Sequence, residues 1–88
     1  MEVKNMIPDE KAIAQRMVNA EESFIEILMK FGNISREEAI KAMITMLKLK
    51  VAKMDAVNGV ISVVHGEFLE PYAIRNAVNY VHKRKGAR

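Results

Sequence analysis

The dipeptide Asn58-Gly59 stands between two strand-like runs, residues 51–57 and 60–64, and constrains the fold more than any other feature of the chain. Asparagine and glycine readily adopt the positive φ angles of a two-residue type I′ turn, so the pattern predicts a β-hairpin. One face of this hairpin is expected to be apolar and to pack on the core. The expected register pairs Val57 with Val60, Ala56 with Ile61, Asp55 with Ser62 and Met54 with Val63. The apolar face collects Ala52, Met54, Ala56, Ile61 and Val63, and the opposite face carries Lys53, Asp55 and Ser62.

Residues 8–31 have the spacing of an amphipathic helix. Pro8 suits the first helical position, and Gly32 is expected to end the helix. Asn19, followed by Glu22, also fits the start of a second helix, which would divide the region in two. The unbroken apolar phase favours one long helix, and residues 1–7 are expected to form a flexible arm. The apolar stripe consists of Ile13, Met17, Ala20, Phe24, Leu28 and Phe31.

Ser35 and Glu38 form a capping box, which predicts a helix over residues 36–49. Its apolar side chains form two rows, so we expect a central helix that is packed on two sides, by the monomer or by a second chain. One row holds Ile40, Met43, Ile44 and Leu47, and the other holds Ala39, Ala42, Met46 and Leu49. The remaining polar stripe consists of Glu38, Lys41, Thr45 and Lys48.

A last helix is expected to begin near Pro71 and to run into a basic tail, residues 83–88. The sequence therefore predicts a single small α+β domain over residues 8–82, in the order helix, helix, hairpin, helix. If residues 8–31 were two helices, this order would resemble that of winged-helix DNA-binding domains, an analogy of architecture without a family motif. The buried side of the last helix is expected to carry Ile74, Ala77, Val78 and Val81, with Arg75, Asn76, Asn79 and His82 outward.

Few residues suit catalysis. The chain has no cysteine, which excludes disulfides, thiolate catalysis and cysteine-ligated metals. Ser62 and His65, three apart on a strand, point to opposite faces. Glu22 and Glu26 share a helix face, yet they provide only a weak metal-ligand set, and no Gly-rich phosphate loop is present. We expect a cytoplasmic binding protein that is not an enzyme. It is expected to bind no cofactor, metal or small-molecule substrate and to associate with no membrane.

Nucleic-acid binding is the first functional hypothesis. The sequence pI is about 9.3, and residues 39–88 contain nine basic and three acidic side chains. In the winged-helix arrangement, residues 36–49 would enter the major groove and Thr45 would face the DNA. Glu37 and Glu38, at the start of that helix, argue against it because they repel phosphate. The candidate nucleic-acid-binding residues are Arg36, Lys41, Lys48, Lys53, Arg75, Lys83, Arg84 and Lys85.

A protein–protein interaction module is the alternative. Its candidate interface residues are Met43, Met46 and Leu49, because flexible methionines suit adaptable contact surfaces. The same methionines also suit an interior that has few aromatic side chains to fill it. A homodimer, an adaptor or an inhibitor of a larger complex, of the kind that phages and mobile elements encode, fits this hypothesis. The basic charge favours nucleic acid.

Overall fold

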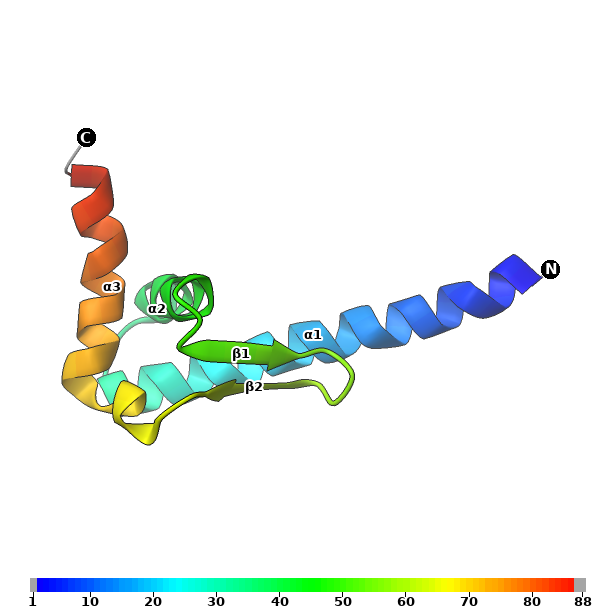
Figure 1. Cartoon of the computed structure of the whole chain (residues 1–88), viewed down its shortest axis with the longest axis horizontal. Coiled ribbons are helices and arrows are strands. Elements are labelled where there is room, and N and C mark those ends of the chain that lie inside the picture. The colour runs from blue at the N-terminus through cyan, green and yellow to red at the C-terminus, as the bar shows by residue number, and fades with distance from the viewer. Residues whose placement is uncertain (1, 87–88) are drawn as a thin grey trace.

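The computed structural model describes the backbone of residues 2–86 and the side chains of residues 10–80. It contains three α-helices, one 3₁₀ helix and a two-stranded antiparallel sheet (Figure 1). This confirms the predicted α+β fold and the order helix, helix, hairpin, helix. In chain order the elements are α1 (Glu2–Gly32), α2 (Arg36–Lys48), β1 (Ala52–Asp55), β2 (Val60–Val63), η1 (Gly66–Leu69) and α3 (Pro71–Gly86).

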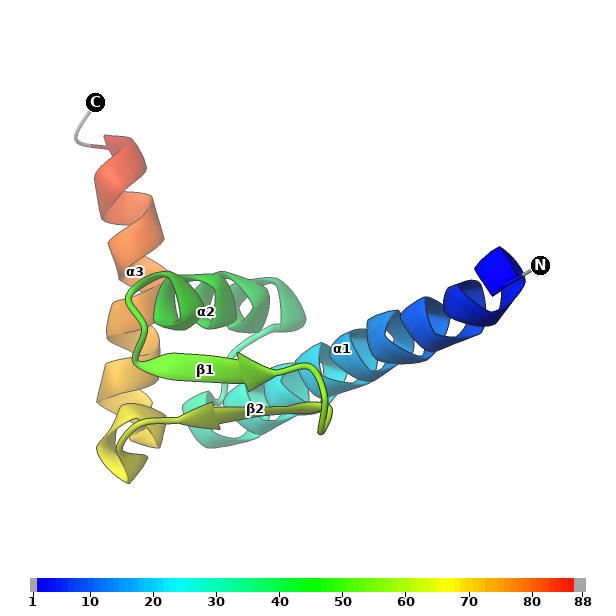
Figure 2. The ribbon, with the colours of Figure 1, turned by 45° about the vertical axis from the view of Figure 1, so that its right-hand side comes forward.

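Helix α1 is continuous, as the unbroken apolar phase favours, and no second helix begins at Asn19. The division that a winged-helix arrangement requires is therefore absent. The predicted helix start at Pro8 is wrong, because the backbone of residues 2–7 already belongs to the helix. Proline has a φ angle that suits a helix, although inside a helix it lacks one backbone hydrogen bond and its ring crowds the carbonyl four residues earlier. Figure 1 and Figure 2 show the N-terminal half of α1 extending away from the other elements.

The sequence pattern predicts that Gly32 ends α1, but in the structure the next residue, Asn33, ends the helix. Asn33 takes the left-handed conformation, with φ 53°, and the Ile34 amide donates to the Met29 carbonyl at 3.3 Å. Gly32 remains helical and is buried against α3. A Cβ at Gly32 would lie 2.8 Å from Cγ2 of Ile74. The glycine is therefore required by the close approach of α1 and α3.

Helix α2 begins with the predicted capping box. The Glu38 amide donates to the Ser35 hydroxyl at 3.2 Å, and the Ser35 amide donates to the Glu38 carboxylate at 3.1 Å. The helix packs against α1, α3 and β1, so its central position is confirmed. Its core side is formed by the small and flexible side chains of Ala39, Ala42, Met43 and Met46.

The hairpin keeps its predicted apolar face but not its predicted pairing. Met54 pairs with Ile61 and Asp55 with Val60, so each strand residue lies two positions away from its expected partner. Residues 56–59 form a four-residue turn in which only Gly59 has a positive φ, 70°. Side chains alternate with a period of two, and a shift of two residues leaves the same ones facing the core. Ala52 and Ile61 are accordingly buried, and Ser62 is exposed.

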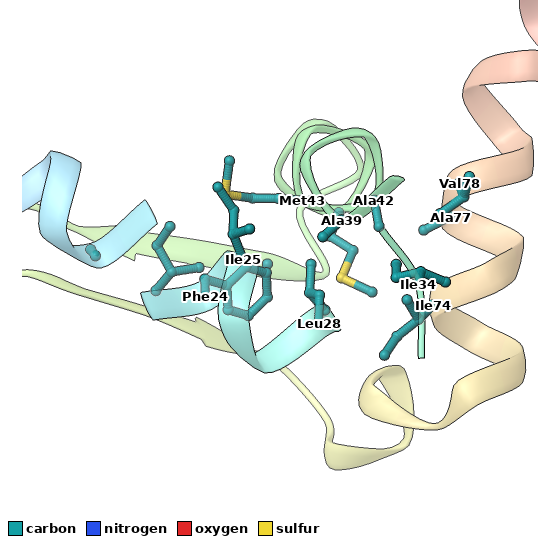
Figure 3. Close-up of a cluster of buried hydrophobic side chains, with 14 residues drawn as sticks. Phe24, Ile25, Leu28, Ile34, Ala39, Ala42, Met43, Ile74, Ala77 and Val78 are labelled. Atoms are coloured by element: carbon teal, nitrogen blue, oxygen red, sulfur yellow. The ribbon is translucent and has the colours of Figure 1, made fainter. Parts of the chain in front are cut away.

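The core lies where α1, α2 and α3 meet, with the inner face of the hairpin at its side. Figure 3 shows Phe24 and Leu28 from α1, Met43 from α2 and Ile74 from α3 within this cluster. The predicted buried stripe of α3 is confirmed at Ile74, Ala77 and Val78, while the side chains of Val81 and His82 lie outside the described residues.

The connection from α2 to β1 places a lysine where glycine is favoured. Lys50 has φ 64°, with its amide bonded to the Leu47 carbonyl at 3.1 Å and the Val51 amide bonded to the Met46 carbonyl at 3.0 Å. This is a Schellman ending, in which the left-handed residue is usually glycine because a Cβ is strained there. We expect Lys50→Gly to stabilise the fold by about 0.5–1 kcal/mol, after allowing for the greater freedom of glycine in the unfolded chain.

Thermal unfolding of Lys50→Gly measures this effect as a rise in Tm of a few degrees. Lys50→Ala is the matched control, since it removes the ammonium group and retains the Cβ. A Tm for the glycine variant at or below that of the alanine variant would contradict the assignment of strain to Lys50.

Candidate functional site

An apolar groove of about 410 Å³ lies between the end of α2, the connection from α2 to β1, η1 and α3. We call it the α2–α3 groove. Met46, Ala73 and Ala77 line it with small or buried side chains, whereas Leu49 and Tyr72 are 48 % and 64 % exposed. Phe68 from η1 is half-buried on another wall. Volumes of this size are typical of binding sites, and such sites are mostly apolar.

The sequence builds this groove from residues four apart on two helices. Tyr72 and Asn76 lie one turn apart on α3, next to Ala73 and Ala77. Large side chains thus stand beside small ones, and the small ones leave the space empty. Residues of η1 and of the α2–β1 connection complete the walls. Sequence patterns do not reveal the site because its residues come from three elements and a connection, although the alternation of large and small residues on α3 is a visible signal.

Thr45 lines the groove from α2 and corrects one expectation. The sequence pattern places it on the polar, DNA-facing stripe, yet it is only 1 % exposed, and its Oγ1 has no hydrogen-bond partner within the described residues. Helix α3 packs on this side of α2, so Thr45 lies inside. Ile44, on the other side, is 51 % exposed. Polarity alone therefore misplaces the solvent face of this helix.

The predicted interface residues of α2 separate into two groups. Met43 and Met46 are buried in the monomer's own core and leave almost no surface for a partner to contact. They fill an interior with few aromatic side chains, which is the other use that the sequence suggests for them. Leu49 alone of the three is exposed, and it lies on the groove.

The predicted nucleic-acid-binding residues are spread over several elements. Lys48 and Lys53 are exposed on either side of the α2–β1 connection, and Lys50, between them, is exposed as well. Lys41 is half-buried in the middle of α2, and Arg75 is exposed on α3. The side chains of Lys83, Arg84 and Lys85 lie outside the described residues, although the backbone there continues α3.

Arg36 makes an ion pair within the protein. Its Nη2 lies 2.7 Å from Oε2 of Glu22, which joins the start of α2 to α1. The hydrogen bond from Arg36 lowers the pKa of the Glu22 carboxyl, and the same bond raises the pKa of Arg36. Both side chains are about half exposed, so solvent weakens the pair. Glu22 is thus already engaged by a cation of its own chain.

The other chemically capable residues form no catalytic arrangement among the described side chains. No three histidine, aspartate or glutamate residues gather there in a way that suits a metal ion. Ser62 and His65 are both exposed, and the His65 ring lies 6.2 Å from the ring of Phe68, centroid to centroid. The α2–α3 groove is therefore the feature that best suits recognition.

Comparisons with known proteins give no match to a family model, a curated protein or a solved structure. Within the described part of the chain, no helix combines the length and the apolar character that crossing a membrane requires. Function is therefore inferred from the α2–α3 groove and from the exposed charged side chains.

Proposed function

We propose that this protein is a non-enzymatic protein–protein interaction module and that the α2–α3 groove docks a second copy of the same chain. The observation that carries the proposal is the exposed apolar rim of the groove, with Tyr72 at 64 % and Leu49 at 48 % exposure around an apolar hollow. Exposed apolar patches with aromatic side chains are characteristic of protein interfaces, where tyrosine often contributes much of the binding energy.

A second copy suits this surface because the surface offers both an exposed aromatic side chain and an apolar hollow. In a two-fold dimer the same patch occurs on both subunits, so it must supply both the projecting side chain and the hollow that receives it. Tyr72 projects at the edge of the groove, and the small side chains of Ala73 and Ala77 line the hollow beside it. Each tyrosine can therefore enter the groove of the other subunit.

The charges around the groove support the same occupant. Glu67 lines one wall, and the exposed Lys48 and Lys50 are the neighbours in sequence of Leu49, which lines another wall. None of the three takes part in an ion pair within the described residues. A surface with an acid on the groove and bases next to Leu49 in the chain allows each subunit to place acid against base on its partner, which favours correct orientation.

The test is the molar mass of the protein in solution, measured by light scattering after gel filtration at increasing concentration. We expect the mass to rise from the 10.0 kDa of one chain towards twice that value. Tyr72→Glu should keep the protein monomeric because it places a charge in the apolar centre of the interface. Val57→Glu is the matched control, since Val57 is 70 % exposed on the hairpin turn and does not line the groove.

Two outcomes would contradict this proposal. One is a wild-type protein that stays at 10.0 kDa at every concentration. The other is a dimer that Val57→Glu disrupts and Tyr72→Glu does not, which would place the interface on the hairpin. Circular dichroism of both variants establishes that each remains folded.

Nucleic-acid binding is a second candidate, favoured by the exposed Lys48, Lys50 and Lys53 at the α2–β1 connection. Titration of a labelled DNA duplex at several salt concentrations tests it. Binding should weaken steeply with salt, and replacing all three lysines with alanine should reduce the slope by about one for each lysine that neutralises a phosphate. Absence of binding at low salt would contradict this candidate and leave the groove proposal untouched.

A further inference from the structure

Asn58-Gly59 is a sequence with an intrinsic chemical reactivity. The backbone nitrogen of a glycine can attack the side-chain carbonyl carbon of the asparagine before it. A new carbon–nitrogen bond closes a five-membered succinimide ring. The bond between the carbonyl carbon and the side-chain nitrogen breaks, and that nitrogen leaves as ammonia. Water then opens the ring to aspartate or to its isomer linked through the side chain. Glycine favours this reaction because no Cβ hinders the approach.

One residue holds both nitrogen atoms that this reaction uses. The Gly59 amide, which is the nucleophile, donates to the backbone carbonyl of Asp55 at 2.8 Å. The Asn58 side-chain nitrogen, which is the leaving group, donates to Oδ2 of Asp55 at 2.7 Å. The Asn58 backbone amide donates to Oδ1 of the same carboxylate at 3.1 Å. Asp55 therefore holds both the nucleophile and the leaving group of the reaction in the closed turn.

We propose that Asn58 is a latent site of spontaneous deamidation and that Asp55 keeps it unreactive while the hairpin turn is closed. Two effects of Asp55 act in the same direction. Its hydrogen bonds hold the Asn58 side chain and the Gly59 amide in place, so the carbonyl carbon is not free to rotate towards the nitrogen. Its negative charge opposes the loss of the amide proton and the build-up of negative charge on the attacked carbonyl.

The carboxylate is ionised under the conditions in which deamidation occurs. The hydrogen bonds from Asn58 lower the pKa of Asp55, with the side-chain bond as the largest cause. The protecting charge is therefore present at neutral and alkaline pH, where the amide nitrogen is most easily deprotonated.

Modification would change the contact between the hairpin and α1. The turn lies against Arg16, whose Nη1 donates to the Val57 carbonyl at 3.3 Å, and a Cβ on Gly59 would lie 3.2 Å from the Arg16 Cβ. Deamidation replaces the amide that donates to Asp55 with a second carboxylate. The two negative groups repel each other, so the turn opens and its contact with α1 loosens.

The experiment follows deamidation of the intact folded chain at mildly alkaline pH by mass spectrometry of the peptide that contains Asn58. We expect Asp55→Ala to deamidate at Asn58 at least about tenfold faster than the wild type, the rate change that corresponds to removing one hydrogen bond to a charged group. Asp55→Asn, which keeps an acceptor oxygen and removes the charge, should lie between them. The wild type unfolded in urea sets the unprotected rate.

The controls separate opening of the turn from unfolding of the domain. Asn33, Asn76 and Asn79 are followed by Ile34, Ala77 and Tyr80, and their modification should remain at the wild-type level in a folded variant. Ser62→Ala changes an exposed residue of β2 away from the turn and should deamidate like the wild type. Equal rates for wild type and both Asp55 variants would overturn the proposal, as would a folded wild type that reacts as fast as the urea-unfolded chain.

Discussion

Met46→Glu is expected to prevent folding, whereas Ile44→Glu, two residues earlier in α2, is expected to leave the domain folded. Met46 of α2 is 2 % exposed and lies between the core and the groove. A carboxylate at this position loses its water and gains no cation, which costs several kcal/mol. That loss is comparable with the whole stability of a small domain, about 5–15 kcal/mol. Ile44 is 51 % exposed, so its replacement keeps the charge in water.

Circular dichroism and thermal unfolding of the two glutamate variants distinguish these outcomes. Met46→Leu is the volume-matched control and should cost less than about 1.5 kcal/mol, because it keeps an apolar side chain of similar size. A Met46→Glu protein as stable as Ile44→Glu would mean that α2 is not the central helix. The assignment of the core and of the groove beside it would then be wrong.

Gly32→Ala is expected to destabilise the domain by about 1–3 kcal/mol, the usual cost of overfilling a packed contact. The added methyl group would lie 2.8 Å from Cγ2 of Ile74, which is shorter than any relaxed carbon–carbon contact. Ile74 is fully buried, so its side chain has little room to move. The higher helix propensity of alanine offsets part of this cost, by up to about 1 kcal/mol.

A double-mutant cycle with Ile74→Ala isolates the contact. Ile74→Ala removes Cγ2, so adding Gly32→Ala in that background should cost little or should stabilise by filling part of the space. Free energies of unfolding from urea titrations provide the four values. If Gly32→Ala costs the same in both backgrounds, the close approach of α1 and α3 is not the reason for the glycine.

Local sequence signals predict most of the fold. The capping box of Ser35 and Glu38 acts within one turn of helix, and the alternation in the strands acts within one strand, so both are visible in the sequence. The pairing of the hairpin depends on a further contact. The carboxylate of Asp55 takes hydrogen bonds from Asn58 and stabilises a four-residue turn in place of the two-residue turn that Asn58-Gly59 predicts.

Features that depend on the meeting of distant elements are not predictable from local patterns. The pattern assigns Gly32 to the end of α1, and its actual neighbour is Ile74 on α3. Polarity places Thr45 in solvent, and it is covered by elements that follow it in the chain. The α2–α3 groove has the same origin, since Leu49, Phe68 and Tyr72 come together only in the folded chain.

Hydrogen exchange measured at low and at high protein concentration tests the docking of a second copy in the α2–α3 groove most directly. We predict that amides of η1 and of residues 72–80 in α3 exchange more slowly at high concentration, while amides of the hairpin turn at residues 56–59 exchange at an unchanged rate. Equal exchange of the groove amides at both concentrations, or protection that appears only in the hairpin, would contradict the proposed docking.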